Sequence, residues 1–109
     1  MNEELGQIDG DLKGLFVENK IDEMRELLRG QPVQVISEIS DYNWNIIKKY
    51  YDTERFDLLF NHFRFVAYTC FMVEYAYEAE LMEEESYHRI MKVFHHILEL
   101  KQTQEKAGC

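Results

Sequence analysis

The sequence predicts an all-α protein, a compact helical bundle of about four to five helices in a single domain. Apolar residues recur at three- and four-residue spacing along most of the chain, which is typical of helices with one buried face. One proline and five glycines are too few for a many-stranded β fold, which needs a turn signal about every 8–12 residues. With 46% hydrophobic residues, the 109-residue chain is sufficient for one core. We therefore treat residues 1–109 as one helical domain.

Residues 1–30 predict an N-terminal helical hairpin. Apolar side chains have helical spacing on both sides of the polar segment 18–20, where Asn19 tolerates the left-handed conformation of a tight turn. Gly30 follows the basic residue Arg29, a pattern typical of a helix end.

Residues 32–101 predict the main helices of the bundle. Pro32 suits the first turn of a helix that reaches Tyr51, either unbroken or interrupted near Ser40. The segment Asp52-Thr53 is a candidate cap for the next helix, which extends to about Met82 without proline or glycine and is apolar on most sides. We expect that helix to be central. A final amphipathic helix reaches residue 101, and the polar residues 102–109 predict a frayed tail.

The charge balance limits the classes of partner. The formal net charge is −9 and the pI about 4.8, so phosphate backbones and anionic lipids repel the domain. The longest uncharged run, residues 65–73, is far shorter than the ~20 residues that span a bilayer. These features predict no direct nucleic-acid binding and no membrane binding, and they favour a basic protein partner.

The cysteines and the first residues predict a cytoplasmic protein. Cys70 lies in the apolar run and Cys109 is the last residue, so a bridge between them would join a core position to a loose end. Two free thiols indicate a reducing compartment. The segment 1–5 lacks the basic and apolar regions of a signal peptide.

A metal site is the first chemistry to consider, because Glu84, His88 and His95 share one face of the last helix. Glu85 and His88 also have the Glu-x-x-His spacing of di-iron bundles. Those bundles need two such motifs and two further carboxylates, and the chain has only one motif. A solvated helix face is the favoured interpretation, and we expect no cofactor.

The motifs of catalysis are absent from the sequence. Cys70 has no basic neighbour that would lower its pKa, and no serine lies in a Gly-x-Ser-x-Gly turn. Gly6, Gly10 and Gly14 have helical spacing rather than the spacing of a phosphate-binding loop. We therefore expect that the protein is not an enzyme.

Two features predict a partner-binding surface. The aromatic residues are more than one bundle core easily hides, and tyrosine and tryptophan are favoured at interfaces. Acidic residues gather between positions 74 and 85. The candidate binding residues are Trp44, Tyr51 and Tyr75, expected to be exposed, together with Glu78, Glu80, Glu83, Glu84 and Glu85.

The sequence thus favours a non-enzymatic protein-binding module that acts by occlusion or adaptor docking, such as an inhibitor, immunity or anti-defence protein. A helical sensor or dimerisation domain of a transcription regulator, active as a homodimer, is the first alternative. A metal-binding bundle centred on His88 and His95 is the second.

Overall fold

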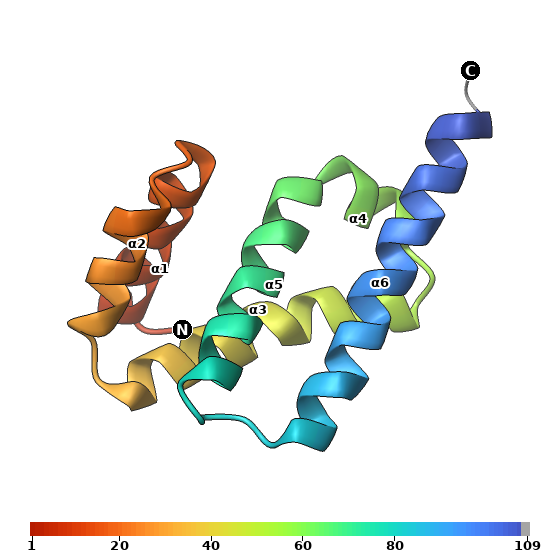
Figure 1. Ribbon diagram of the computed structural model, residues 1–109. Coiled ribbons are helices and arrows are strands. Elements are labelled where there is room, and N and C mark those ends of the chain that lie inside the picture. The colour runs from red at the N-terminus through yellow and green to blue at the C-terminus, as the bar shows by residue number, and fades with distance from the viewer. Residues whose placement is uncertain (108–109) are drawn as a thin grey trace.

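A computed structural model describes residues 1–107, which form six helices and contain no strand. Figure 1 shows a helical hairpin, α1 and α2, on one side of α5 and the long helix α6 on the other, with α3 crossing behind α5 and α6. The prediction of an all-α single domain is confirmed. The number of helices is larger than the four to five expected.

The hairpin consists of α1 (Glu3–Val17) and α2 (Ile21–Arg29), as the sequence predicts. The side chain of Asn2 caps α1 by accepting a hydrogen bond from the backbone N–H of Leu5 at 2.9 Å. Asn19 has φ 61° in the turn, so the prediction of a left-handed residue there is confirmed. Gly30 ends α2 with φ −78°, a conformation open to any residue, so its lack of a side chain is not required there.

Helix α3 (Val33–Asp52) is continuous, and there is no break at Ser40, which is buried in the middle of the helix. Thr53 ends α3 instead of beginning the next helix, because its hydroxyl donates to the carbonyl of Lys49 at 2.7 Å. The chain then turns at Glu54, which has φ 57°.

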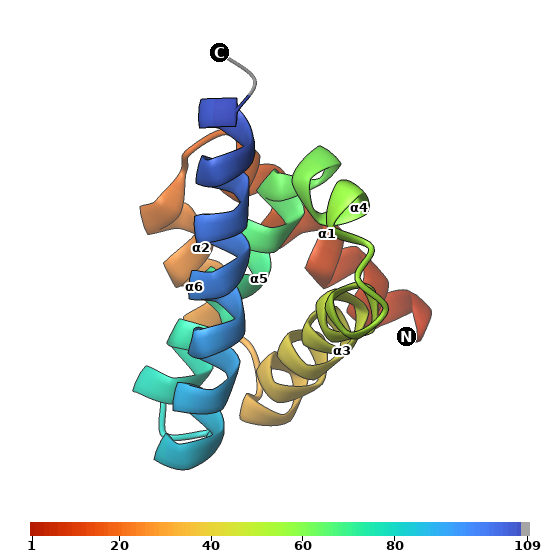
Figure 2. The same cartoon turned by 90° about the vertical axis from the view of Figure 1, so that its right-hand side faces the viewer.

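The single helix expected from residue 54 to about residue 82 is in fact two helices, α4 (Phe56–Asn61) and α5 (Phe63–Glu78). His62 separates them with φ −116° and ψ 41°, outside the helical region. No proline or glycine marks the break. Because this segment is apolar on most sides, one straight helix could not bury all of it. The break lets α4 pack against α3 and α6 while α5 continues between the other helices (Figure 2).

Helix α6 (Glu84–Ala107) packs against α5 in the opposite direction (Figure 1). It extends beyond residue 101, so residues 102–107 of the expected frayed tail are helical, although exposed. An i,i+4 ion pair between Lys101 and Glu105, 2.7 Å long, lies in this part of the helix. Residues 108 and 109, with Cys109, lie outside the described part. Among residues 1–107, no helix combines the length and the apolar character needed to cross a membrane.

Two apolar clusters form the core, and α5 contributes to both. The first joins the hairpin to the beginning of α3 and to α5, and includes Leu12, Met24, Ile39, Tyr68 and Met72. The second joins the end of α3 to α4, α5 and α6, and includes Ile47, Leu59, Val66, Val73 and Ile97. The prediction that the most apolar segment is central is confirmed for α5.

Candidate functional site

The predicted carboxylates gather where α5 ends and α6 begins. Glu78, Glu80, Glu83, Glu84 and Glu85 are all exposed, and we call these five residues the acidic end. They come from the last turn of α5, the connection between the helices and the first turn of α6.

Three members of the acidic end have basic neighbours. Arg25 of α2 lies 3.9 Å from Glu78, and Arg89 lies 3.7 Å from Glu85. The Nε2 atom of His88 lies 3.4 Å from a carboxylate oxygen of Glu84. In the described part of the chain, neither Glu80 nor Glu83 has an ion pair, so these two carboxylates are available to an external cation.

A pair of stacked tyrosines lies within the acidic end. The rings of Tyr77 in α5 and Tyr87 in α6 are nearly parallel, with an interplanar angle of 7° and centroids 3.9 Å apart. Burial, and then the Glu74 carboxylate, raise the pKa of Tyr87. The stacked rings offer a flat π surface in a negative field, which suits a lysine or arginine side chain.

The three aromatic residues expected at the surface are instead half-buried and do not join the acidic end. The ring of Trp44 packs against that of Phe94, with centroids 5.5 Å apart. The hydroxyl of Tyr51 lies 2.5 Å from Nδ1 of His96. Phe94 and His96 lie more than one turn beyond the carboxylates in the first turn of α6, so both contacts are separate from the acidic end. Tyr75 packs against the first core cluster. Core filling therefore accounts for much of the aromatic surplus.

The three histidine and carboxylate residues considered for a metal do not converge. Glu84 and His88 are neighbours, whereas His95 lies two turns further along α6. Across residues 1–107, no three histidine, cysteine, aspartate or glutamate side chains form a group that could hold an ion.

A groove runs between α5 and α6. It encloses about 460 Å³, which is within the range of about 300–1,000 Å³ typical of ligand sites. Its walls are mostly apolar, and Phe16 of α1 closes one side. We call it the α5–α6 groove, and its lining comprises Phe16, Phe63, Val66, Ala67, Cys70, Phe71, Glu74, Met91, Phe94, His95 and Leu98.

Among residues 1–107, Glu74 is the only carboxylate in the lining of this groove, and it is half-buried. No ion pair reaches it from the described residues, and its Oε1 lies 4.0 Å from the sulfur of Cys70. Burial and then the Glu74 carboxylate raise the pKa of the Cys70 thiol to about 11. Cys70 is therefore protonated at neutral pH, and it is a poor nucleophile.

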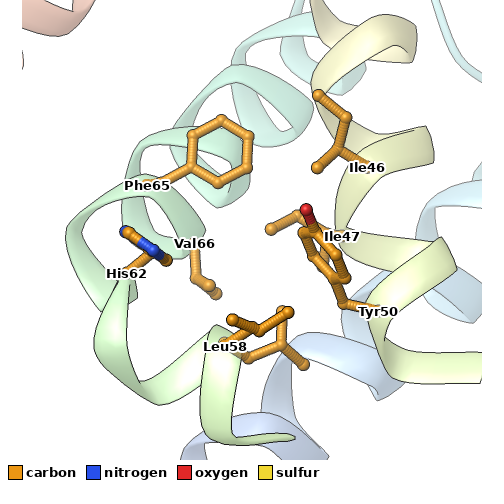
Figure 3. A pocket seen from close by; sticks show the side chains of 8 residues that line it. Ile46, Ile47, Tyr50, Leu58, His62, Phe65 and Val66 are labelled. Carbon is orange, nitrogen blue, oxygen red and sulfur yellow. The ribbon is translucent and has the colours of Figure 1, made fainter. Parts of the chain in front are cut away.

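A second hollow, of about 340 Å³, lies among α3, α4 and α5, and we call it the α3–α4–α5 pocket. Figure 3 shows Tyr50 and His62 on opposite sides of it, with Phe65 and Leu58 at its two ends. Isoleucine, leucine and valine side chains form the rest of the wall. A phenol and an imidazole are thus the side-chain polar groups that a bound molecule would meet.

A buried polar cluster joins three helices beneath these surfaces. Asp9 of α1 is 4% exposed and accepts hydrogen bonds from the hydroxyl of Tyr68 in α5, at 2.7 Å, and from the amide of Asn43 in α3, at 3.0 Å. Lys13, one turn along α1, forms an ion pair with the other carboxylate oxygen at 2.7 Å. The Asn43 amide also donates to the carbonyl of Ile39, and its side-chain oxygen has no hydrogen-bond partner among the described residues. The cluster fixes the three helices relative to one another, with its carboxylate buried and the Lys13 side chain reaching the surface.

Comparison with known proteins adds no family. No family model, curated protein or solved structure matches the chain.

The α5–α6 groove was not predicted from the sequence, although a signal for it exists. Ala67, Cys70 and Glu74 follow one another at three- and four-residue spacing on α5, and Met91, His95 and Leu98 do the same on α6. Each set forms a stripe of its own helix. The sequence does not indicate that the two stripes face the same side of the helix pair.

Proposed function

We propose that the protein is a non-enzymatic binding module that docks a basic protein partner through the acidic end. The observation that carries this proposal is the presence of two exposed carboxylates, Glu80 and Glu83, that form no ion pair with any described residue and lie beside the stacked rings of Tyr77 and Tyr87. Carboxylates steer a basic protein to the site, and tyrosine rings provide contact area of the kind that interfaces use.

The proposed action is occlusion or adaptor docking, as in an inhibitor or immunity protein of the cytoplasm. The net charge of −9 supports attraction to a basic surface over a wide range of approach directions. The free thiol of Cys70 supports a reducing compartment.

The test is a pull-down with the tagged protein from the lysate of the source cell, at low and at raised salt. We expect one stoichiometric partner that is lost at raised salt, because salt screens exposed charge pairs beyond about 8 Å at physiological ionic strength. Glu83→Lys should abolish this capture. Asp11→Lys makes the same charge change on the exposed face of α1 and should leave it intact. Equal losses in the two variants would overturn the acidic end as the docking surface.

A second candidate function is a ligand-sensing helical domain, and the α3–α4–α5 pocket favours it. The pocket is apolar apart from Tyr50 and His62, and its volume suits a small aromatic or aliphatic molecule. Thermal-shift and NMR titrations with such compounds would test it. Chemical-shift changes that follow Tyr50 and His62 would support a sensor, and the absence of any saturable change would remove it.

A further inference from the structure

We infer that the α5–α6 groove binds an amphipathic helix of the partner. The apolar side chains of that helix fill the groove, and its last turn carries lysine or arginine side chains. This inference rests on the proposed function and specifies the part of a basic partner that the surface recognises.

The shape of the groove suits a helix. Two antiparallel helices form its walls, and the lining on α5 extends from Phe63 to Glu74, a distance of about 16 Å at 1.5 Å per residue. A partner helix of three to four turns therefore matches the groove in length. Leu98 is 41% exposed at the end where α5 begins, so this end presents a large apolar side chain to the partner.

The charge of the groove changes along its length. Near the beginning of α5, Phe63 is apolar and the ammonium of Lys101 lies 5.1 Å from the centre of its ring. Towards the end of α5 the lining includes Glu74, and Glu78 lies one turn further on the same helix. The raised pKa values of Cys70 and Tyr87 both have Glu74 among their causes, so its negative field extends from the groove to the acidic end.

Glu74 specifies the sign of the occupant's charge. A half-buried carboxylate without an ion pair gains more from a cation than an exposed one, because solvent screens it less. A lysine or arginine in the last turn of the partner helix would meet Glu74 and Glu78 while its apolar face covers Met91 and Leu98. Basic residues are also favoured at the carboxyl end of a helix, so we infer that the partner helix lies parallel to α5.

A second copy of this chain fits the groove less well. Two copies would bring together surfaces that each belong to a protein of charge −9. A basic helix has no such conflict.

The probe is a synthetic 16-residue amphipathic peptide with leucine at one helical face and three lysines in its last turn. Its affinity is measured by fluorescence anisotropy at low salt. The control peptide has the same composition, with the three lysines moved to the first turn. We expect saturable binding of the first peptide and binding at least about fivefold weaker for the second.

Two variants of the protein test the groove itself. Glu74→Gln should weaken the probe about fivefold, the effect of removing one partly exposed charge pair, and Leu98→Glu should weaken it more than about tenfold. Glu38→Gln and Val33→Glu are the matched controls on α3, where both positions are exposed, and should bind as the unchanged protein does. Circular dichroism confirms that each variant is folded. Equal affinities for the Leu98→Glu and Val33→Glu variants would overturn the inference.

The outcomes separate this inference from the proposed function. If Glu83→Lys abolishes capture of the natural partner but Leu98→Glu does not, the acidic end docks the partner and the groove inference is wrong. If sedimentation detects a dimer that Leu98→Glu dissociates, the occupant is a second copy and the inference is also wrong. Loss of capture with both variants, together with saturable binding of the probe, supports it.

Discussion

The hydroxyl of Tyr68 in α5 donates a hydrogen bond of 2.7 Å to the carboxylate of Asp9 in α1, and both residues are buried. Asn43 of α3 donates to the same carboxylate oxygen. One acidic side chain thus connects the hairpin to the two helices that it packs against. Because a buried charge without partners is costly, this contact specifies how the hairpin is placed on the rest of the fold.

Removal of the Tyr68 hydroxyl should destabilise the protein. Tyr68→Phe keeps the ring but leaves Asp9 without one of its donors, and we expect the free energy of unfolding to fall by about 2 kcal/mol, as for a hydrogen bond to a charged group. Urea unfolding measures the change. Tyr42→Phe is the matched control, because Tyr42 is 43% exposed and its loss should cost less than about 0.5 kcal/mol. If Tyr68→Phe leaves the free energy of unfolding unchanged, the hydrogen bonds to Asp9 do not have this structural role.

Much of the fold follows from local pattern in the sequence. Helical spacing of apolar residues predicts the hairpin, the start of α3 and the central position of α5, and Asn19 predicts the turn between α1 and α2. The break at His62 has no local signal. It arises because α4 packs on α3 and α6. The contact with α6 joins residues that are distant in the chain, and the local spacing of apolar residues carries no information about such contacts.

The candidate site could be predicted only in part for the same reason. The acidic end is contiguous in sequence, so its carboxylates could be named from residues 78–85 alone. The groove depends on how α5 and α6 face each other and on Phe16 of α1, which is distant from both. The half-buried state of Trp44 follows from its contact with Phe94, a pairing that the sequence does not indicate.

Replacement of Gly10 by alanine should stabilise α1. Gly10 lies in the interior of the helix and is exposed, and a Cβ atom added there meets no atom within 4 Å beyond its chain neighbours and the local backbone of its own helix. Glycine in a helix interior is less favourable than alanine by roughly 0.5–1 kcal/mol, so Gly10→Ala should raise the free energy of unfolding by about that amount. Gly30→Ala, at the end of α2, should have a smaller effect. Destabilisation by Gly10→Ala in urea unfolding would contradict this prediction.

The turn between α3 and α4 should accept glycine at position 54. Glu54 has φ 57°, and the left-handed conformation costs a residue with a Cβ atom roughly 1 kcal/mol. Glu54→Gly should therefore raise the melting temperature by a few degrees, since about 1 kcal/mol shifts a domain of this size by about 4–8 °C. Thr53→Gly is the control in the same turn. It should lower the melting temperature, because the Thr53 hydroxyl bonds to the carbonyl of Lys49.

The thiol of Cys70 should make the stability depend on pH in the alkaline range. Its pKa is about 11 in the folded protein, above the ordinary value of 9.0, because of burial and then of Glu74. Between these two values the unfolded chain has lost the thiol proton while the folded protein retains it. The free energy of unfolding therefore falls as the pH rises through this window. Below about pH 8 the thiol is protonated in both states and contributes no slope.

Urea unfolding from pH 7 to pH 10.5, in a Cys109→Ser background so that one thiol titrates, measures this effect. Cys70→Ala should flatten the decline of the free energy of unfolding above pH 9. The difference between the curves with and without Cys70 isolates the thiol from the tyrosines and lysines, which titrate in the same pH range. Glu74→Gln should reduce the same difference without abolishing it, because burial is the larger cause of the raised pKa. Parallel curves for Cys70 and its alanine variant would mean that the thiol is no more protected in the folded protein than in the unfolded chain. If Glu74→Gln instead leaves the difference between the two curves unchanged, the negative field of Glu74 does not reach the thiol, and the electrostatic argument for a cationic occupant of the groove is weakened.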